Sequence, residues 1–95
     1  MTRIQLDNIK PILKKNGVTF AGIFGSQLGN RARPDSDVDI LVRFRTPQGL
    51  IKTARLQRLL SQKLKRKVDL VTEGALSPYI KNEVLRKVRP IYEER

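Results

Sequence analysis

The sequence predicts an α/β fold, in which helices pack against a single small β-sheet. Short apolar runs rich in β-branched residues alternate with longer stretches whose apolar residues recur every three or four positions, the pattern of strands alternating with amphipathic helices. Turn-forming residues separate these stretches. A chain of 95 residues is long enough for one modest core. We therefore expect residues 1–95 to form a single domain with its elements in the order αβαβαβ.

Three apolar runs are expected to form strands. Residues 18–24 and 38–44 are apolar almost throughout, which is typical of strands buried on both faces, and the second is expected to be the central strand. Residues 68–71 form a third, shorter run. Each expected strand ends where its apolar run meets charged or turn-forming residues.

Four stretches are expected to be helical, at residues 4–15, 27–36, 50–65 and 79–88. Pro11 predicts that the first helix starts late or kinks, and the second is a short helical piece followed by a loop. Ser77 and Pro78 are typical of an N-cap and a first helical position. Residues 92–95 are expected to fray. The third helix carries an apolar side expected to face the core: Leu56, Leu59, Leu60 and Leu64.

The composition restricts the chemistry that the chain can perform. It has no cysteine and no histidine, which excludes disulfides, thiolate zinc sites and a histidine general base. Carboxylates acting with Mg²⁺ or Mn²⁺ are the chemistry that remains. The formal charge of +11, from 20 basic and 9 acidic residues, favours polyanions or an acidic partner. No apolar run approaches the roughly 20 residues of a membrane span and no signal-peptide pattern is present, so we expect a cytoplasmic protein without membrane contact.

Two aspartates open the second expected strand. Asp37 and Asp39 are two residues apart, so in a strand their carboxylates point to the same face, about 6.5 to 7 Å apart at their Cα atoms. Such a pair repels, and binding of hard divalent cations is a common reason to retain it. An EF-hand loop is excluded because Ile40 and Thr46 occupy its required glycine and glutamate positions, and no glycine-lysine pair supports a P-loop.

A Gly25-Ser26 pair follows the first expected strand, and Asp69 lies near the start of the third. A glycine permits close backbone approach to a ligand, and amides at a helix start can bind phosphate. An ordinary strand-to-helix turn capped by Ser26 is the structural alternative. For Asp69 the alternative is a solvated residue next to a turn.

Together, Gly-Ser, a short helical segment and Asp-x-Asp on the next strand resemble the signature of the DNA polymerase beta-like superfamily of nucleotidyltransferases. The ARPDS sequence of residues 32–36 is similar to the lead-in of minimal nucleotidyltransferases, which include the MntA-like antitoxins. The resemblance implies a mixed rather than all-parallel sheet. It also implies a third carboxylate, Asp69, on a strand next to Asp37 and Asp39, with all three at one end of the sheet.

The resemblance further implies a metal-dependent transfer of a nucleoside monophosphate, AMP from ATP in the expected case, to a hydroxyl. Asp37, Asp39 and Asp69 would be catalytic and would hold two Mg²⁺ or Mn²⁺ ions. The nucleotide would contact a second set of residues: Gly25, Ser26, Arg33 and Ser36. The implied partner is a small helical HEPN toxin, one tyrosine of which would receive AMP.

Two other functions stay open at this point. Many members of the family have Arg-Gly where this chain has Gly29 and Asn30, which is compatible with an antitoxin that acts by contact alone. A basic nucleic-acid-binding domain is the other alternative, although the aromatic residues that stack on bases are scarce. The basic run at residues 63–67 fits either a helix C-terminus or an anion site.

Overall fold

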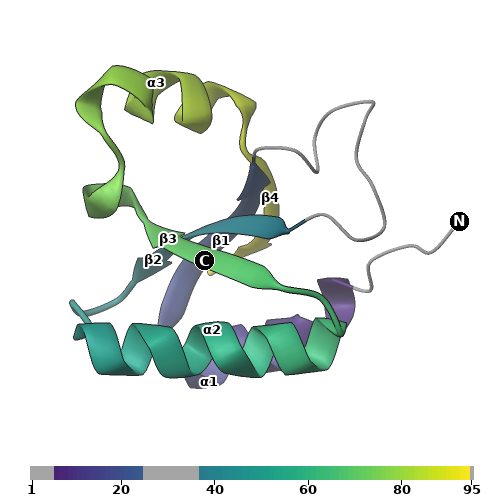
Figure 1. Ribbon diagram of the computed structural model, residues 1–95. Helices are drawn as coiled ribbons and strands as arrows, with labels where there is room; N and C mark the ends of the chain where they lie inside the picture. The colour runs from purple at the N-terminus through teal and green to yellow at the C-terminus, as the bar shows by residue number, and fades with distance from the viewer. Residues whose placement is uncertain (1–5, 25–36, 95) are drawn as a thin grey trace, which may run out of the picture.

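The computed structural model describes residues 6–24 and 37–94, and its central layer is a four-stranded sheet with the order β3-β2-β1-β4 (Figure 1). Helices α1 and α2 cover one face of this sheet, and α3 lies on the opposite side (Figure 1). The elements in chain order are the 3-10 helix η1 (Leu6–Ile9), α1 (Lys10–Lys15), β1 (Val18–Phe24), β2 (Val38–Phe44), α2 (Leu50–Leu64), β3 (Val68–Thr72), the 3-10 helix η3 (Glu73–Ala75), α3 (Pro78–Lys87) and β4 (Arg89–Glu93).

The sheet is mixed, as the resemblance implied. Strand β2 is parallel to β3, and β1 is antiparallel to both β2 and β4. The parallel pair follows from the helical crossover between β2 and β3, because a strand that returns through a helix on one face runs in its original direction. The antiparallel pair brings the end of β1 beside the start of β2, where Asp37 and Asp39 lie.

Alternation along β2 builds the core. Val38, Ile40 and Val42 are fully buried on the face covered by α1 and α2, where they join Leu56 and Leu60 of α2 in one apolar cluster. Burying such side chains contributes roughly 1.5 to 3 kcal/mol each. The prediction for the leucine side of α2 is wrong at one position, since Leu59 is 40% exposed.

The C-terminal segment corrects the sequence prediction most clearly. Instead of fraying, residues 89–93 form β4, which pairs with the free edge of β1. Ile91 and Tyr92 pack against the core cluster. The strands approach closely at Gly22, where an added Cβ would lie 2.6 Å from Cγ2 of Val88 and 3.0 Å from the carbonyl oxygen of Arg89. Residues 89–93 are therefore part of the sheet.

The helix boundaries follow the sequence signals. Pro11 lies in the first turn of α1, which starts only at Lys10, and the Ser77 hydroxyl accepts a hydrogen bond from the Tyr79 amide at 3.3 Å to cap α3. Helix α2 ends at Leu64, and the next residue, Lys65, has a φ of 55° that breaks the helical geometry. The helical piece expected within residues 27–36 lies outside the described residues. Among the helices of residues 6–24 and 37–94, none is long and apolar enough to cross a membrane.

Two α2 side chains cover the outer edge of β3. The amide oxygen of Gln57 accepts from the Leu70 N–H at 2.8 Å, and the Ser61 hydroxyl accepts from the Val68 N–H at 3.0 Å. Both donors belong to a strand at the sheet edge, where N–H groups would otherwise lack a ladder partner. Helix and sheet are thus joined by polar contacts as well as by the apolar core.

Candidate active site

Asp39 and Asp69 are brought side by side by the parallel pairing of β2 and β3. They are direct register partners, and neighbouring strands lie about 4.8 Å apart. Since opposite residues of paired strands share a face, both carboxylates stand on the same side of the sheet. This pairing meets the condition that the transferase interpretation required, a third acid beside the Asp-x-Asp pair.

That side is the one opposite α1 and α2. Val38, Ile40 and Val68 point into the helix-covered core, so Asp39 and Asp69, their neighbours in sequence, point to the face on which α3 lies (Figure 1). Asp39 is half-buried, whereas Asp37 and Asp69 are exposed. A ligand can therefore reach the acids from solvent.

The acids influence one another electrostatically. Burial raises the pKa of the Asp39 carboxyl above its ordinary value of 3.8, and the negative charges of Asp69 and Asp37 raise it further. Repulsion that acts on Asp39 from both neighbours indicates three carboxylates in one region. A divalent cation would relieve this repulsion, and carboxylate oxygens are the ligands that Mg²⁺ and Mn²⁺ prefer.

Asp37 also lies near a cation that the sequence did not mark as part of the site. Its Oδ2 atom is 3.9 Å from Nζ of Lys67, the last residue of the basic run before β3. The sequence left two roles open for this run, stabilising the C-terminus of α2 or binding an anion. Lys67 lies beyond the end of that helix and next to an acid of the candidate site. Within residues 6–24 and 37–94, no three acids are gathered closely enough to form a ready-made metal cage.

Four residues of the candidate site were expected to bind the nucleotide. Gly25, Ser26, Arg33 and Ser36 all lie outside the described residues. The described chain leaves β1 at Phe24, which is the antiparallel register partner of Asp39. Gly25 is the next residue in sequence after that partner.

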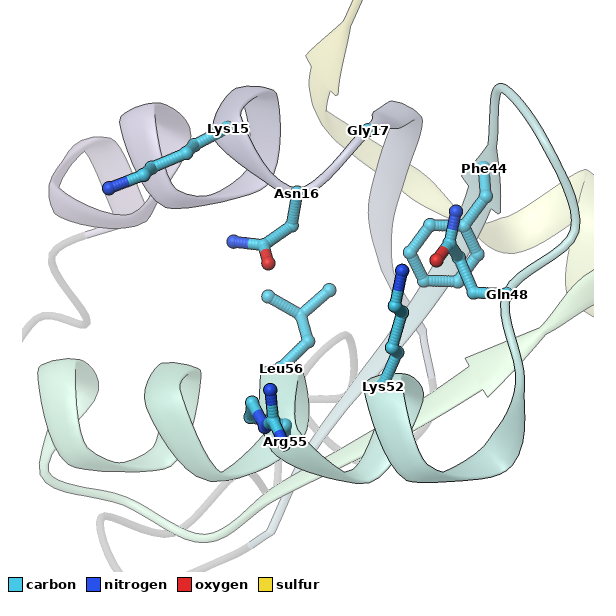
Figure 2. Close-up of a pocket in the computed structure, with 8 residues that line it drawn as sticks. All are labelled: Lys15, Asn16, Gly17, Phe44, Gln48, Lys52, Arg55 and Leu56. Atoms are coloured by element: carbon cyan, nitrogen blue, oxygen red, sulfur yellow. The ribbon is translucent and has the colours of Figure 1, made fainter.

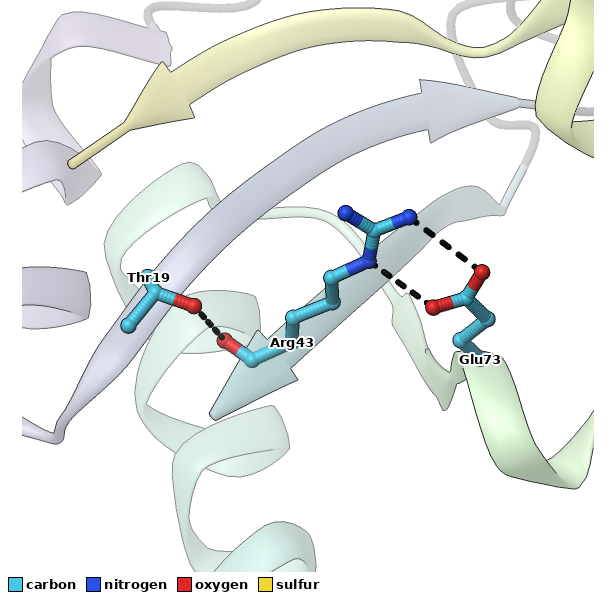
Figure 3. Close-up of polar contacts among 3 residues, drawn as sticks. All are labelled: Thr19, Arg43 and Glu73. Carbon is cyan, nitrogen blue, oxygen red and sulfur yellow. Dashed lines mark hydrogen bonds and ion pairs between the residues drawn. The ribbon is translucent and has the colours of Figure 1, made fainter. Parts of the chain in front are cut away.

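A different polar group occupies the far end of the same sheet face. Arg43 donates from Nε and Nη2 to the two carboxylate oxygens of Glu73, at 2.8 and 3.2 Å (Figure 3). Its guanidinium also lies 5.3 Å from the centre of the Phe20 ring. Its carbonyl oxygen accepts a hydrogen bond from the Thr19 hydroxyl at 3.3 Å. Glu73 is thus engaged by an arginine, and this group links η3 to the sheet.

Comparison with known families decides the assignment. The sequence matches the family described as Polymerase beta, Nucleotidyltransferase over residues 7–95. The chain belongs to this family. Protein adenylyltransferase MntA of Thermococcus cleftensis is 38% identical over 96 residues, which cover 93% of this chain and 97% of the relative. Protein MJ0435 of Methanocaldococcus jannaschii is 39% identical over 79 residues, which cover 83% of this chain and 85% of the relative.

Solved structures agree with the fold of this nucleotidyltransferase. A chain of a toxin-antitoxin complex with AMP-PNP superposes with a TM-score of 0.81 at 22% identity, covering 96% of this chain and 75% of that one. A chain from the complex of tri-AMPylated Shewanella oneidensis HEPN toxin with MNT antitoxin gives 0.72 at 22% identity, covering 93% and 69%. The family expected from the sequence is confirmed, and the protein is an enzyme of the nucleotidyltransferase class.

Proposed function

We propose that this nucleotidyltransferase transfers AMP from ATP to a tyrosine hydroxyl of a HEPN partner protein and so acts as its antitoxin. The observation that carries the proposal is the register pairing of Asp39 with Asp69 on an accessible sheet face. The similarity to the MntA adenylyltransferase supports AMP as the transferred group. The AMPylated HEPN toxin bound to an MNT antitoxin of the same fold supports the class of partner.

In this mechanism the aspartates bind the metal ions that the reaction needs. Asp37, Asp39 and Asp69 would hold two Mg²⁺ or Mn²⁺ ions, which supply neutralisation of charge on the phosphate oxygens. Gly25 and Ser26 bind the β and γ phosphates of ATP. A second pair of residues, Arg33 and Ser36, adds contacts to the nucleotide.

The transfer step forms one bond and breaks one. The acceptor oxygen attacks the α-phosphorus of ATP, the bond from that phosphorus to the bridging oxygen of the β-phosphate breaks, and pyrophosphate leaves. The proton of the acceptor hydroxyl passes to the carboxylate of Asp69, which is exposed and lies beside Asp39.

The test compares substitutions of chemically identical residues inside and outside the site. Asp39→Asn and Asp69→Asn should each lower adenylyl transfer from α-labelled ATP to the HEPN partner by about a hundredfold or more. Asp7→Asn is the matched control, because Asp7 lies in η1 and is exposed beside Lys10. It should leave the rate unchanged. Mass spectrometry of the partner should find AMP on a tyrosine.

Two outcomes would contradict the proposal. Neutralisation of the HEPN partner without any nucleotide adduct, unchanged by Asp39→Asn, would assign inhibition to contact alone. Label carried from γ-labelled ATP rather than from α-labelled ATP would mean that a phosphoryl group is moved instead of AMP.

A further inference from the structure

A second region suited to a ligand lies far along β2 from the acids. A pocket of about 360 Å³ is enclosed by the end of α1, the chain after β2 and the first half of α2 (Figure 2). Phe44 and Leu56 give it apolar walls, and Lys15, Lys52 and Arg55 give it positive charge. Phe44 is the last residue of β2 and Asp39 is its second, so this pocket is separate from the candidate active site.

Among residues 6–24 and 37–94, the three cations of the pocket have no acidic partner. Within the described part of the chain, Lys15, Lys52 and Arg55 make no hydrogen bond or ion pair with any side chain. Cations elsewhere do pair with acids, as Arg43 does with Glu73 and Lys87 with Glu83. A lysine offers three N–H donors and an arginine five, so the pocket has donors available for an incoming anion.

The surrounding helices strengthen the positive potential. Helix α1 carries three lysines and α2 carries four basic residues, and neither helix contains an acid. Clefts lined by charge of one sign concentrate counter-ions. The usual interpretation of exposed basic residues is a solvated face. The combination of charge with a concave pocket and a partly apolar wall is what goes beyond that interpretation.

The frame of the pocket is held by backbone contacts. The Arg45 N–H donates to the carbonyl oxygen of Gly17 at 2.8 Å, which ties the end of β2 to the turn after α1. Gly17 has a φ of +79°, a conformation that glycine adopts readily. Asn16 caps α1, and its side-chain Nδ2 donates to the Ile12 carbonyl oxygen at 2.7 Å. These contacts fix two walls of the pocket in place before any ligand binds.

The side chains are arranged around this space in a way that suits a small ligand. Lys52 extends from α2 toward Phe44 and Gln48, and the Asn16 side chain points toward Leu56 across the gap between the two helices (Figure 2). The Lys15 ammonium lies farther along α1, away from Lys52 (Figure 2). Lys52 thus supplies positive charge at the end of the pocket beside Phe44, and the walls are partly apolar.

We propose that this pocket is a second binding site, for a small organic phosphate such as a nucleoside monophosphate. Lys52 and Arg55 bind the phosphoryl oxygens, and the base or sugar rests against Phe44, which is only partly buried. The volume lies at the lower end of the roughly 300 to 1,000 Å³ of small-molecule sites, which suits a small ligand. This site does not depend on the transfer activity proposed above.

The test follows backbone amide shifts during titration with AMP and, separately, with inorganic phosphate, in buffer with EDTA. Both probes should shift the amides of Asn16, Gly17, Gln48 and Lys52. The variant Lys52→Gln/Arg55→Gln should weaken AMP binding there at least tenfold. A matched control, Arg58→Gln/Lys63→Gln, removes the same charge from exposed positions of α2 outside the pocket, and it should bind AMP within twofold of the unmodified protein.

Three results would overturn the proposal. Equal weakening in both double variants would show general attraction of anions to a basic face, and shifts confined to residues around Asp39 and Asp69 would place AMP in the active site alone. The third result is that a short single-stranded oligonucleotide binds far more tightly than AMP, that its affinity falls steeply with salt, and that both double variants weaken its binding equally. That result would identify the face as a nucleic-acid surface.

Discussion

Asp39 lies in surroundings that disfavour its charged form. Burial is the largest cause of its raised pKa, followed by the charges of Asp69 and Asp37. Such strain on a carboxylate is common at functional sites, where binding of a cation or a proton relieves it. The same residue therefore connects the stability of the fold with the proposed chemistry.

This leads to a pH-dependent prediction for metal-free protein. Above pH 3.8 an unfolded Asp39 loses its proton, whereas the folded protein retains it until the raised pKa is passed. Stability therefore falls as pH rises through that interval, and the loss persists at higher pH. Asp39→Asn, which carries no charge, should melt at a higher temperature than the unmodified protein at about pH 7, and the gain should vanish below pH 3.8.

Calorimetry in EDTA measures this difference, with Asp7→Asn as the control that should show no such gain. Adding Mg²⁺ should then stabilise the unmodified protein and not Asp39→Asn, since a ligand that binds only the folded state raises its stability. A melting temperature that Asp39→Asn lowers at neutral pH without metal would refute the assigned cause of the pKa shift.

At the scale of elements, α2 acts on β3 through two side chains spaced four residues apart. Gln57 and Ser61 accept hydrogen bonds from Leu70 and Val68, the outward N–H groups of an edge strand. The Ser61 hydroxyl also donates to the Gln57 carbonyl oxygen at 2.9 Å, which directs its lone pairs toward β3. An edge strand without such cover can pair with another chain.

Removing the acceptor at position 57 should therefore be costly. Gln57→Leu leaves the N–H of Leu70 without its hydrogen-bond partner, and Leu70 is only 8% exposed. We therefore expect the free energy of unfolding to fall by about 1 to 3 kcal/mol. Denaturant unfolding measures it. The control is Gln62→Leu, an exposed position of the same helix, where the change should stay within about 0.5 kcal/mol. Equal effects of the two substitutions would mean that the hydrogen bond to β3 contributes nothing.

For the whole molecule, periodicity alone was enough to locate most of the sheet. Strands β1 and β2 are almost continuous apolar runs, as is typical of strands buried on both faces, whereas β3 is a shorter run that contains the exposed Asp69. Strand β4 could not be found this way, because residues 89–93 contain a proline and two exposed charged ends. Its partner is the free edge of β1, and proline is tolerated at an edge strand. Only the tertiary arrangement supplies that edge.

Some residues of the candidate site can likewise be found from the sequence, and others cannot. Asp37 and Asp39 are readable from spacing, but the position of Asp69 opposite Asp39 was implied by family resemblance and depends on a parallel register that spacing does not give. Lys67 beside Asp37 was hidden inside a basic run with several other roles. The polar Gln57 and Ser61 next to the leucine side of α2 were a readable signal, since polar residues on an apolar face need partners.

Charge is the property that acts over the entire molecule. The formal charge of +11 is carried on a body with principal extents of 36 × 31 × 26 Å. At 10 mM salt the screening length is about 30 Å, so most charges repel one another across the whole fold, whereas at 0.1 M it is about 10 Å. Mutual repulsion destabilises a compact state. Salt should therefore stabilise this protein.

We expect the melting temperature to rise by roughly 4 to 8 °C between 10 mM and 100 mM KCl, on the order of 1 kcal/mol. Exposed ion pairs such as Arg43 with Glu73 weaken over the same range, but each contributes only about 0 to 1 kcal/mol. Arg58→Gln/Lys63→Gln removes two of the repelling charges, so it should start with a higher melting temperature at 10 mM and gain less from added salt. A melting temperature that falls as KCl is added would show that the ion pairs outweigh the repulsion, because screening of repulsion raises stability and only screening of attraction lowers it.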